Sequence, residues 1–142
     1  MFNGCTGLTS APELPAPTLA DYCYCNMFAG CTSLTSAPSL PATALTGSCY
    51  QSMFAGCTSL TTAPELPAAT LVNYCYRYMF SGCTNLNYIK CLATNFSGTG
   101  SCQNWVSGVQ TTSGTFVKAS STSSWATGAS GIPNNWTVQD AS

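Results

Sequence analysis

The residues best able to do chemistry in this sequence are its ten cysteines, and the chain of 142 residues contains no histidine. Cysteines in this number indicate a disulfide framework or a metal site. A zinc site needs tetrahedral ligands, usually from C-x2-C pairs or from cysteine and histidine together. Cys23 and Cys25 are separated by one residue, and this spacing occurs nowhere else in the chain. The sequence therefore predicts no metal and no other cofactor.

Most of the cysteines recur at one spacing, which favours a structural role. Two sets repeat every 26 residues: Cys5, Cys31, Cys57 and Cys83, and then Cys23, Cys49 and Cys75. On a helix, Cys23 and Cys31 would be roughly 12 Å apart, beyond the limit of about 7 Å between the Cα atoms of a disulfide. Because free cysteine packs like a small hydrophobic residue, we expect both sets to be buried thiols.

The remaining cysteines lie outside these sets. Cys25 occupies the position that Gln51 and Arg77 take in later units, so we expect it to be exposed and able to react or to link two chains. Cys91 and Cys102 could form a disulfide near the end of the chain.

Acid–base catalysis would depend on four carboxylates, Glu13, Asp21, Glu65 and Asp140. Glu13 and Glu65 share a repeat position two units apart, which is about 10 Å if units stack at strand spacing. That separation nominally fits inverting glycosidases. Both residues are expected to be solvated, however, and triads that contain histidine are impossible. The sequence therefore predicts a protein that is not an enzyme.

Charge is scarce in this chain, which excludes another class of function. Only 5% of the residues are charged, against roughly 25% in typical domains. Three cations and a net charge of −1 cannot form the basic surface that nucleic acid requires. No apolar run approaches the roughly 20 residues of a membrane span. We therefore expect neither nucleic-acid binding nor membrane insertion.

The elements that position these residues are repeats. The phrase MFAGCTSLT, or a close variant, opens four units at intervals of 26 residues. The units begin at Met1, Met27, Met53 and Met79. Self-similarity at such a period is typical of stacked repeats. We expect residues 1–92 to form about 3.5 coils in which like residues lie over like, as with Phe28, Phe54 and Phe80.

Each unit is expected to contain one helix and one strand. Apolar residues recur every fourth position, as at Leu19, Cys23, Met27 and Cys31. This is the stripe of a short helix, and Gly30 is a typical helix end. The proline-rich stretch LTSAPSLPA suits a short extended segment. The sequence therefore predicts an α/β repeat solenoid, leucine-rich-repeat-like, with one short helix and one short parallel strand per 26-residue coil.

The F-x-G-C-x-x-L phrase followed by P-x-L-P resembles the BspA-like leucine-rich repeats of bacterial surface proteins, with a longer unit than is usual there. Residues from about 87 to 140 resemble the C-terminal segment of repeat proteins from gut bacteria and their phages. The resemblance implies a curved, right-handed solenoid with parallel strands, exposed at the cell surface and active in adhesion.

The repeat decays after Met79, so we expect residues 93–142 to form a degenerate last coil and a small β-rich cap. GTFVKAS at 114–120 and NWTVQD at 135–140 are predicted to be strands. The tryptophans all lie in this region, at Trp105, Trp125 and Trp136. We expect them to close the open end of the core, and the alternative is a carbohydrate-binding platform.

The function predicted from these features is a non-enzymatic extracellular or surface module that binds a protein or glycan, with Tyr78 and Trp125 as a candidate ligand surface. A structural spacer or fibre segment of a surface or phage-tail assembly is the alternative, and ice binding through the threonine positions is a third hypothesis. Met1 is in phase with the repeat, which favours a fragment of a longer array whose export signal lies upstream. Residues 1–26 are expected to promote self-association.

Overall fold

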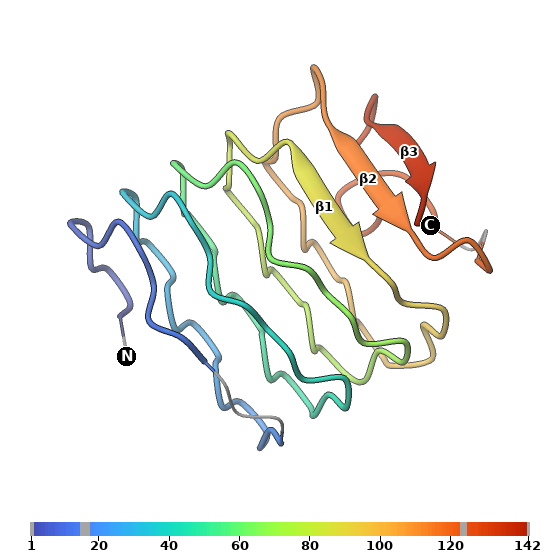
Figure 1. Cartoon of the computed structure of the whole chain (residues 1–142), viewed down its shortest axis with the longest axis horizontal. Coiled ribbons are helices and arrows are strands. Elements are labelled where there is room, and N and C mark those ends of the chain that lie inside the picture. Colours follow the sequence, from blue (N-terminus) through green and yellow to red (C-terminus); the bar gives the residue numbers. More distant parts are fainter. Residues whose placement is uncertain (1, 15–17, 123–124, 142) are drawn as a thin grey trace.

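The coils of the chain lie side by side along one axis, from the N-terminal coil to the last strand (Figure 1). The computed structural model describes residues 2–14, 18–122 and 125–141, so Met1 lies outside the described residues. Backbone hydrogen bonds join neighbouring coils at equivalent positions. Phe2 N–H donates to Met27 C=O, and Phe28 N–H donates to Met53 C=O, both at 2.9 Å.

The segment that leads to Gly30 is a ribbon of turns. Alternate residues close local turns, as when Cys25 N–H donates to Tyr22 C=O. The residues between them donate to the next coil, as when Asn26 N–H donates to Gln51 C=O. The backbone φ is positive at every fourth residue, with 59° at Tyr22, 57° at Asn26 and 75° at Gly30. A right-handed helix cannot contain these angles.

The predicted α/β solenoid is wrong, and so is its description as a leucine-rich repeat solenoid. The described residues contain no helix, and their strands are three short ones in a single open sheet. The spacing of four residues misled the prediction because it fits two structures. A helix brings residues i and i+4 to one face, and a turn repeated every four residues does the same.

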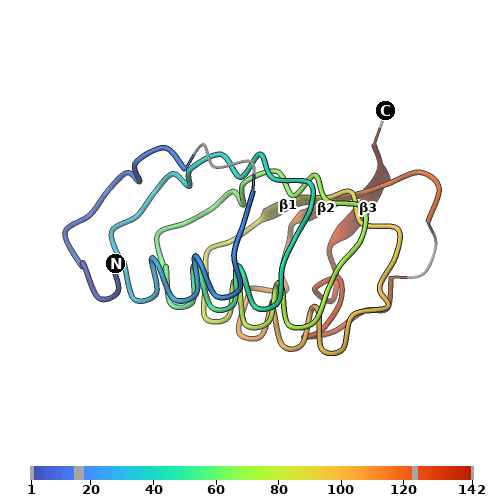
Figure 2. The ribbon, with the colours of Figure 1, turned by 90° about the horizontal axis from the view of Figure 1, so that it is seen from below.

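The three strands form a parallel sheet in the order β1, β2, β3. They are β1 (Tyr88–Cys91), β2 (Thr115–Lys118) and β3 (Thr137–Asp140). The last two confirm the strands predicted within 114–120 and 135–140. Figure 2 shows that the sheet lies on the side of the molecule opposite the zigzag turns.

Earlier coils do not form the strand that the sequence predicts for each unit. They make only isolated bridges along this side, such as the one between Ser10 and Ser36. Proline explains the difference, because it has no N–H to donate to a ladder. β1 forms in the unit where Lys90 stands at the position of Pro64.

Aromatic rings from equivalent positions stack through the interior. Phe28 and Phe54 have ring centroids 5.7 Å apart, and Phe54 and Phe80 are 5.8 Å apart, with nearly parallel rings. This confirms the prediction that these phenylalanines lie over one another. A second row contains Tyr24, Tyr50, Tyr76, Trp105 and Trp125, each ring stacked on the next.

The hydrogen-bond register between coils crosses the boundary predicted at residue 92. Phe80 N–H donates to Trp105 C=O at 2.8 Å, and Gly82 N–H donates to Ser107 C=O at 2.7 Å. Gly108 repeats the positive φ of Gly82, at 80° and 77°. A Cβ atom at Gly108 would lie 3.4 Å from the Gly82 nitrogen, so the two backbones are in close contact.

Candidate functional site

The cysteines of the inner coils are buried free thiols that serve the packing. The Sγ of Cys57 donates to the carbonyl of Phe28 at 3.2 Å, and the Sγ of Cys83 donates to that of Phe54 at 3.0 Å. Burial raises the pKa of Cys57 to about 12. Since the thiolate is the nucleophile, these neutral thiols are poorly suited to covalent chemistry.

The candidate reactive thiol, Cys25, is half-buried, although the sequence predicts that it is exposed. The Asn26 amide lies 3.4 Å from its Sγ as a hydrogen-bond donor, and burial raises the Cys25 pKa. A raised pKa lowers the thiolate fraction and therefore the reactivity. The exposed thiols are instead Cys5 and Cys23, because their sets begin at the first coil.

Cys91 and Cys102 are both buried, and both are free thiols. The disulfide considered between them is therefore not formed. Burial raises the pKa of Cys91 to about 12 and raises that of Cys102 as well. Within the part of the chain that the structure describes, no cluster of three or more cysteines and carboxylates could hold a metal ion.

The carboxylates lie on the surface and not in a shared pocket. Glu13 and Glu65 are both exposed. Glu65 forms an ion pair with Lys90 at 3.5 Å. Both groups therefore lie in the solvated position that the sequence predicts for them.

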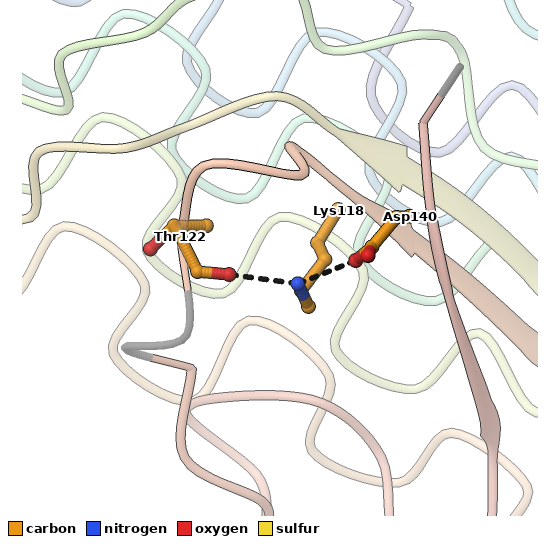
Figure 3. A network of polar contacts seen from close by, with 3 residues as sticks. All are labelled: Lys118, Thr122 and Asp140. Carbon is orange, nitrogen blue, oxygen red and sulfur yellow. Dashed lines mark hydrogen bonds and ion pairs between the residues drawn. The ribbon is translucent and has the colours of Figure 1, made fainter.

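The second ion pair fastens the C-terminal strands to each other. The Nζ of Lys118 on β2 donates to the Oδ1 of Asp140 on β3 at 2.6 Å, and to the Thr122 carbonyl at 2.7 Å (Figure 3). Lys90 and Lys118 are thus both paired with carboxylates. Two of the three cations of the chain are consequently neutralised where they stand.

The tryptophans close the C-terminal end of the aromatic interior, as predicted for Trp105 and Trp136. Trp105 is fully buried, and its Nε1 donates to the Gly131 carbonyl at 2.8 Å. Trp136 is 7% exposed, and its Nε1 donates to the Gln110 carbonyl at 2.9 Å. Trp125 differs because it is only partly buried.

A cavity of about 380 Å³ opens beside Trp125. The Trp125 ring stacks on Trp105 at 5.5 Å and meets the edge of Phe96 at 4.7 Å. Its Nε1 is buried and has no hydrogen-bond partner among the described residues. Ser101, Gln103 and Ser130 also line the cavity. This site therefore combines aromatic surface, an unsatisfied donor and neutral polar side chains.

Tyr78, the other residue of the candidate ligand surface, belongs to a separate cluster. The Arg77 guanidinium carbon lies 5.1 Å from the Tyr74 ring centroid and 4.9 Å from that of Tyr78. Hydrogen bonds from the Asn104 amide and then from Arg77 lower the pKa of the exposed Tyr78 hydroxyl. The sequence therefore identified one residue of each group but did not identify the cation between the tyrosines.

The cluster and the cavity share a border at Gly100. A Cβ atom at Gly100 would lie 2.6 Å from the Tyr74 ring, so this ring covers the glycine. Gly100 and Gln103 both line the cavity. The aromatic cation of Arg77 and the cavity beside Trp125 therefore belong to one continuous region of the surface.

Comparison with protein-family models, with curated proteins and with solved structures finds no match for the chain. In the described ranges there is also no helix that is long and apolar enough to cross a membrane.

Proposed function

We propose that this protein is a non-enzymatic interaction module, outside the cell or at its surface, which binds a glycan or protein ligand beside Trp125. The observation that carries this proposal is the cavity in which an aromatic ring, an unsatisfied Nε1 donor and neutral polar groups converge. A buried donor without a partner costs about 1–3 kcal/mol. A ligand acceptor at this position would remove that cost.

The size and lining of the cavity support ligand binding. Its volume of about 380 Å³ lies within the range of small-molecule sites. Aromatic side chains pack against apolar faces of a ligand, and Gln103 and Ser130 offer hydrogen bonds to its polar groups. This combination suits a neutral or weakly charged partner such as a sugar.

The resemblance of F-x-G-C-x-x-L to BspA-like repeats supports an adhesin-like role at the cell surface. It is a resemblance of sequence phrases, and it is independent of the cavity. A bacterial or phage surface is therefore the setting that we propose for the module.

A structural role as a spacer or fibre segment is the second candidate. It is favoured by the uniform stacking of rings from coil to coil, as between Phe28, Phe54 and Phe80. Such a role requires regular coils and no ligand.

A screen against glycans and extracellular-matrix proteins tests the two candidates. We expect selective binding by the unmodified protein and its loss in Trp125→Ala and in Ala126→Tyr, which fills the cavity from its exposed lining residue Ala126. Tyr22→Ala is the control, because Tyr22 is 64% exposed and does not line the cavity. Thermal unfolding of each variant separates loss of binding from loss of fold. No selective ligand for the folded, unmodified protein would favour the spacer.

A further inference from the structure

Arg77 is a cation without a counterion. Lys90 and Lys118 lie within 4 Å of carboxylates, whereas Arg77 forms no ion pair with any described residue. The chain carries only three cations, and its net charge is −1. The one unpaired cation therefore lies beside the cavity, and repulsion from neighbouring cations would not explain its position.

The Arg77 side chain is held in place before any ligand arrives. Its guanidinium lies near the rings of Tyr74 and Tyr78, at 5.1 and 4.9 Å. Its Nε is buried and lacks a hydrogen-bond partner among the described residues. Cation–π contacts of this kind contribute about 0.5–1 kcal/mol each at exposed sites. Restricting the long side chain in advance lowers the entropy cost of binding an anion.

The surroundings of Arg77 are aromatic and amide groups. Tyr78 is hydrogen-bonded by Asn104 of the next coil, and the Tyr74 ring covers Gly100. Gln103 takes the position of Arg77 in that coil and lines the cavity. An anion bound at Arg77 would therefore have ring faces beside it and amide groups within the same region.

We propose that Arg77 is the anion-binding residue of this surface and that its ligand is an acidic sugar, whose carboxylate pairs with the guanidinium. This assignment rests on the proposed function and names its ligand class. Arginine binds a carboxylate through two parallel hydrogen bonds, which suits a single fixed cation. The tyrosine rings take the face of the sugar, and Gln103 and Asn104 take its hydroxyl groups.

An acidic sugar fits the region better than an acidic peptide. A peptide rich in carboxylates is recognised by clusters of arginines, and the described residues offer one unpaired cation here. A sugar acid carries one carboxylate per ring and several hydroxyl groups. Its chemistry matches one arginine surrounded by neutral donors and acceptors.

Four probes test the assignment: α2,3-sialyllactose, trigalacturonic acid, neutral lactose and an octaglutamate peptide. We expect the unmodified protein to bind at least one acidic sugar about tenfold more tightly than lactose. Arg77→Gln should weaken that binding about tenfold. Glutamine is compatible with the fold, since Gln51 and Gln103 occupy the same position in the neighbouring coils.

Lys90→Gln is the matched control, because it removes a cation that is already paired with Glu65. It should leave binding of the acidic sugar unchanged. Binding should also weaken as salt rises from about 0.05 to 0.5 M, since salt screens exposed charges. Thermal unfolding of both variants checks that the fold is retained.

Equal binding of the acidic sugar by Arg77→Gln and by the unmodified protein would overturn the assignment, and so would a preference for lactose. Either result would leave the proposed function standing. Tighter binding of octaglutamate than of both acidic sugars would overturn the ligand class. Failure of the unmodified protein to bind either acidic sugar would also overturn the inference. The proposed function is judged separately, by the wider screen and the Trp125 cavity variants.

Discussion

The sulfur of Cys57 lies 3.2 Å from the carbonyl oxygen of Phe28, 29 residues earlier and in the preceding coil. Cys83 makes the same contact with Phe54, and Cys31 makes it with Phe2. The thiol is thus a hydrogen-bond donor between coils as well as a small hydrophobic residue.

Alkylation should therefore divide the cysteines by coil. We expect iodoacetamide without reductant or denaturant to modify Cys5 and Cys23 first, because they are exposed. Cys57, Cys83 and Cys91 should react only after denaturation, since they are buried and burial raises their pKa. Intact mass and peptide mapping measure the order. Early labelling of Cys57 would contradict the packing described for the inner coils.

Stability should fall at alkaline pH. The pKa of Cys57 is about 12 when folded and 9.0 in its unperturbed form. Unfolding lets this thiol ionise, so its contribution is fully present below pH 9 and is lost between about pH 9 and 12. Each such thiol lowers the free energy of unfolding by about 1.4 kcal/mol per pH unit in that window. Urea denaturation of the protein and of Cys57→Ala across this range checks the slope, which should be shallower in the variant.

Ser52→Gly should stabilise the turn ribbon. Ser52 has a φ of 55°, in the left-handed region where a side chain costs about 1–2 kcal/mol. Glycine relieves this cost but loses about 0.5–1 kcal/mol to backbone entropy. We expect a net gain of about 0.5–1 kcal/mol by urea denaturation. Ala55→Gly is the control and should be destabilising, since Ala55 is not among the residues with positive φ. A lower stability of Ser52→Gly would argue against the strain.

Trp105→Ala should be among the most damaging substitutions in the chain. Trp105 is fully buried, stacks on Tyr76 at 5.9 Å and tilts against Phe80 at 6.1 Å. Its removal ends both aromatic rows in a cavity, which costs about 3–5 kcal/mol. Val138→Ala should have little effect, because Val138 is 43% exposed. Similar losses in the two variants would mean that Trp105 does not close the core.

An extra coil should be accepted between the second and third. Duplication of residues 27–52 directly after Ser52 places every new residue beside equivalents of its present neighbours. Stability should rise as each added interface contributes. A higher melting temperature and a larger denaturant m-value are the expected result. Loss of a cooperative transition would show that neighbouring coils are not interchangeable.

The stacking of like residues was predictable because the 26-residue period is printed in the sequence. The local backbone was not. Four-residue spacing fits both a helix and the turn ribbon, and the difference lies in the positive φ of Tyr22 and Ser48, residues that rarely adopt it. The prolines did carry a signal: Pro38 and Pro64 mark coils without a regular strand, and Lys90 marks the coil that has one.

The continuation beyond residue 92 also left a signal in the sequence. WVSGV at 105–109 has the same pattern of apolar residues, serine and glycine as MFSGC at 79–83, exactly one period earlier in number. The candidate site was only half predictable. Tyr78 and Trp125 are both there, but the role of Arg77 depends on the two rings beside it and on the pairing of both lysines elsewhere, which only coordinates reveal.

Along the turn ribbon, every hydrogen bond between coils runs one way, from an N–H group to a carbonyl of the following coil. The first coil consequently presents outward-facing acceptors at Asn3, Cys23 and Cys25, which receive no backbone donor from the described residues. Two copies meeting front to front along this ribbon would oppose oxygen to oxygen. Any neighbour that extends the stack here must bring a matching strip of amide hydrogens, so assembly at this end has a built-in direction.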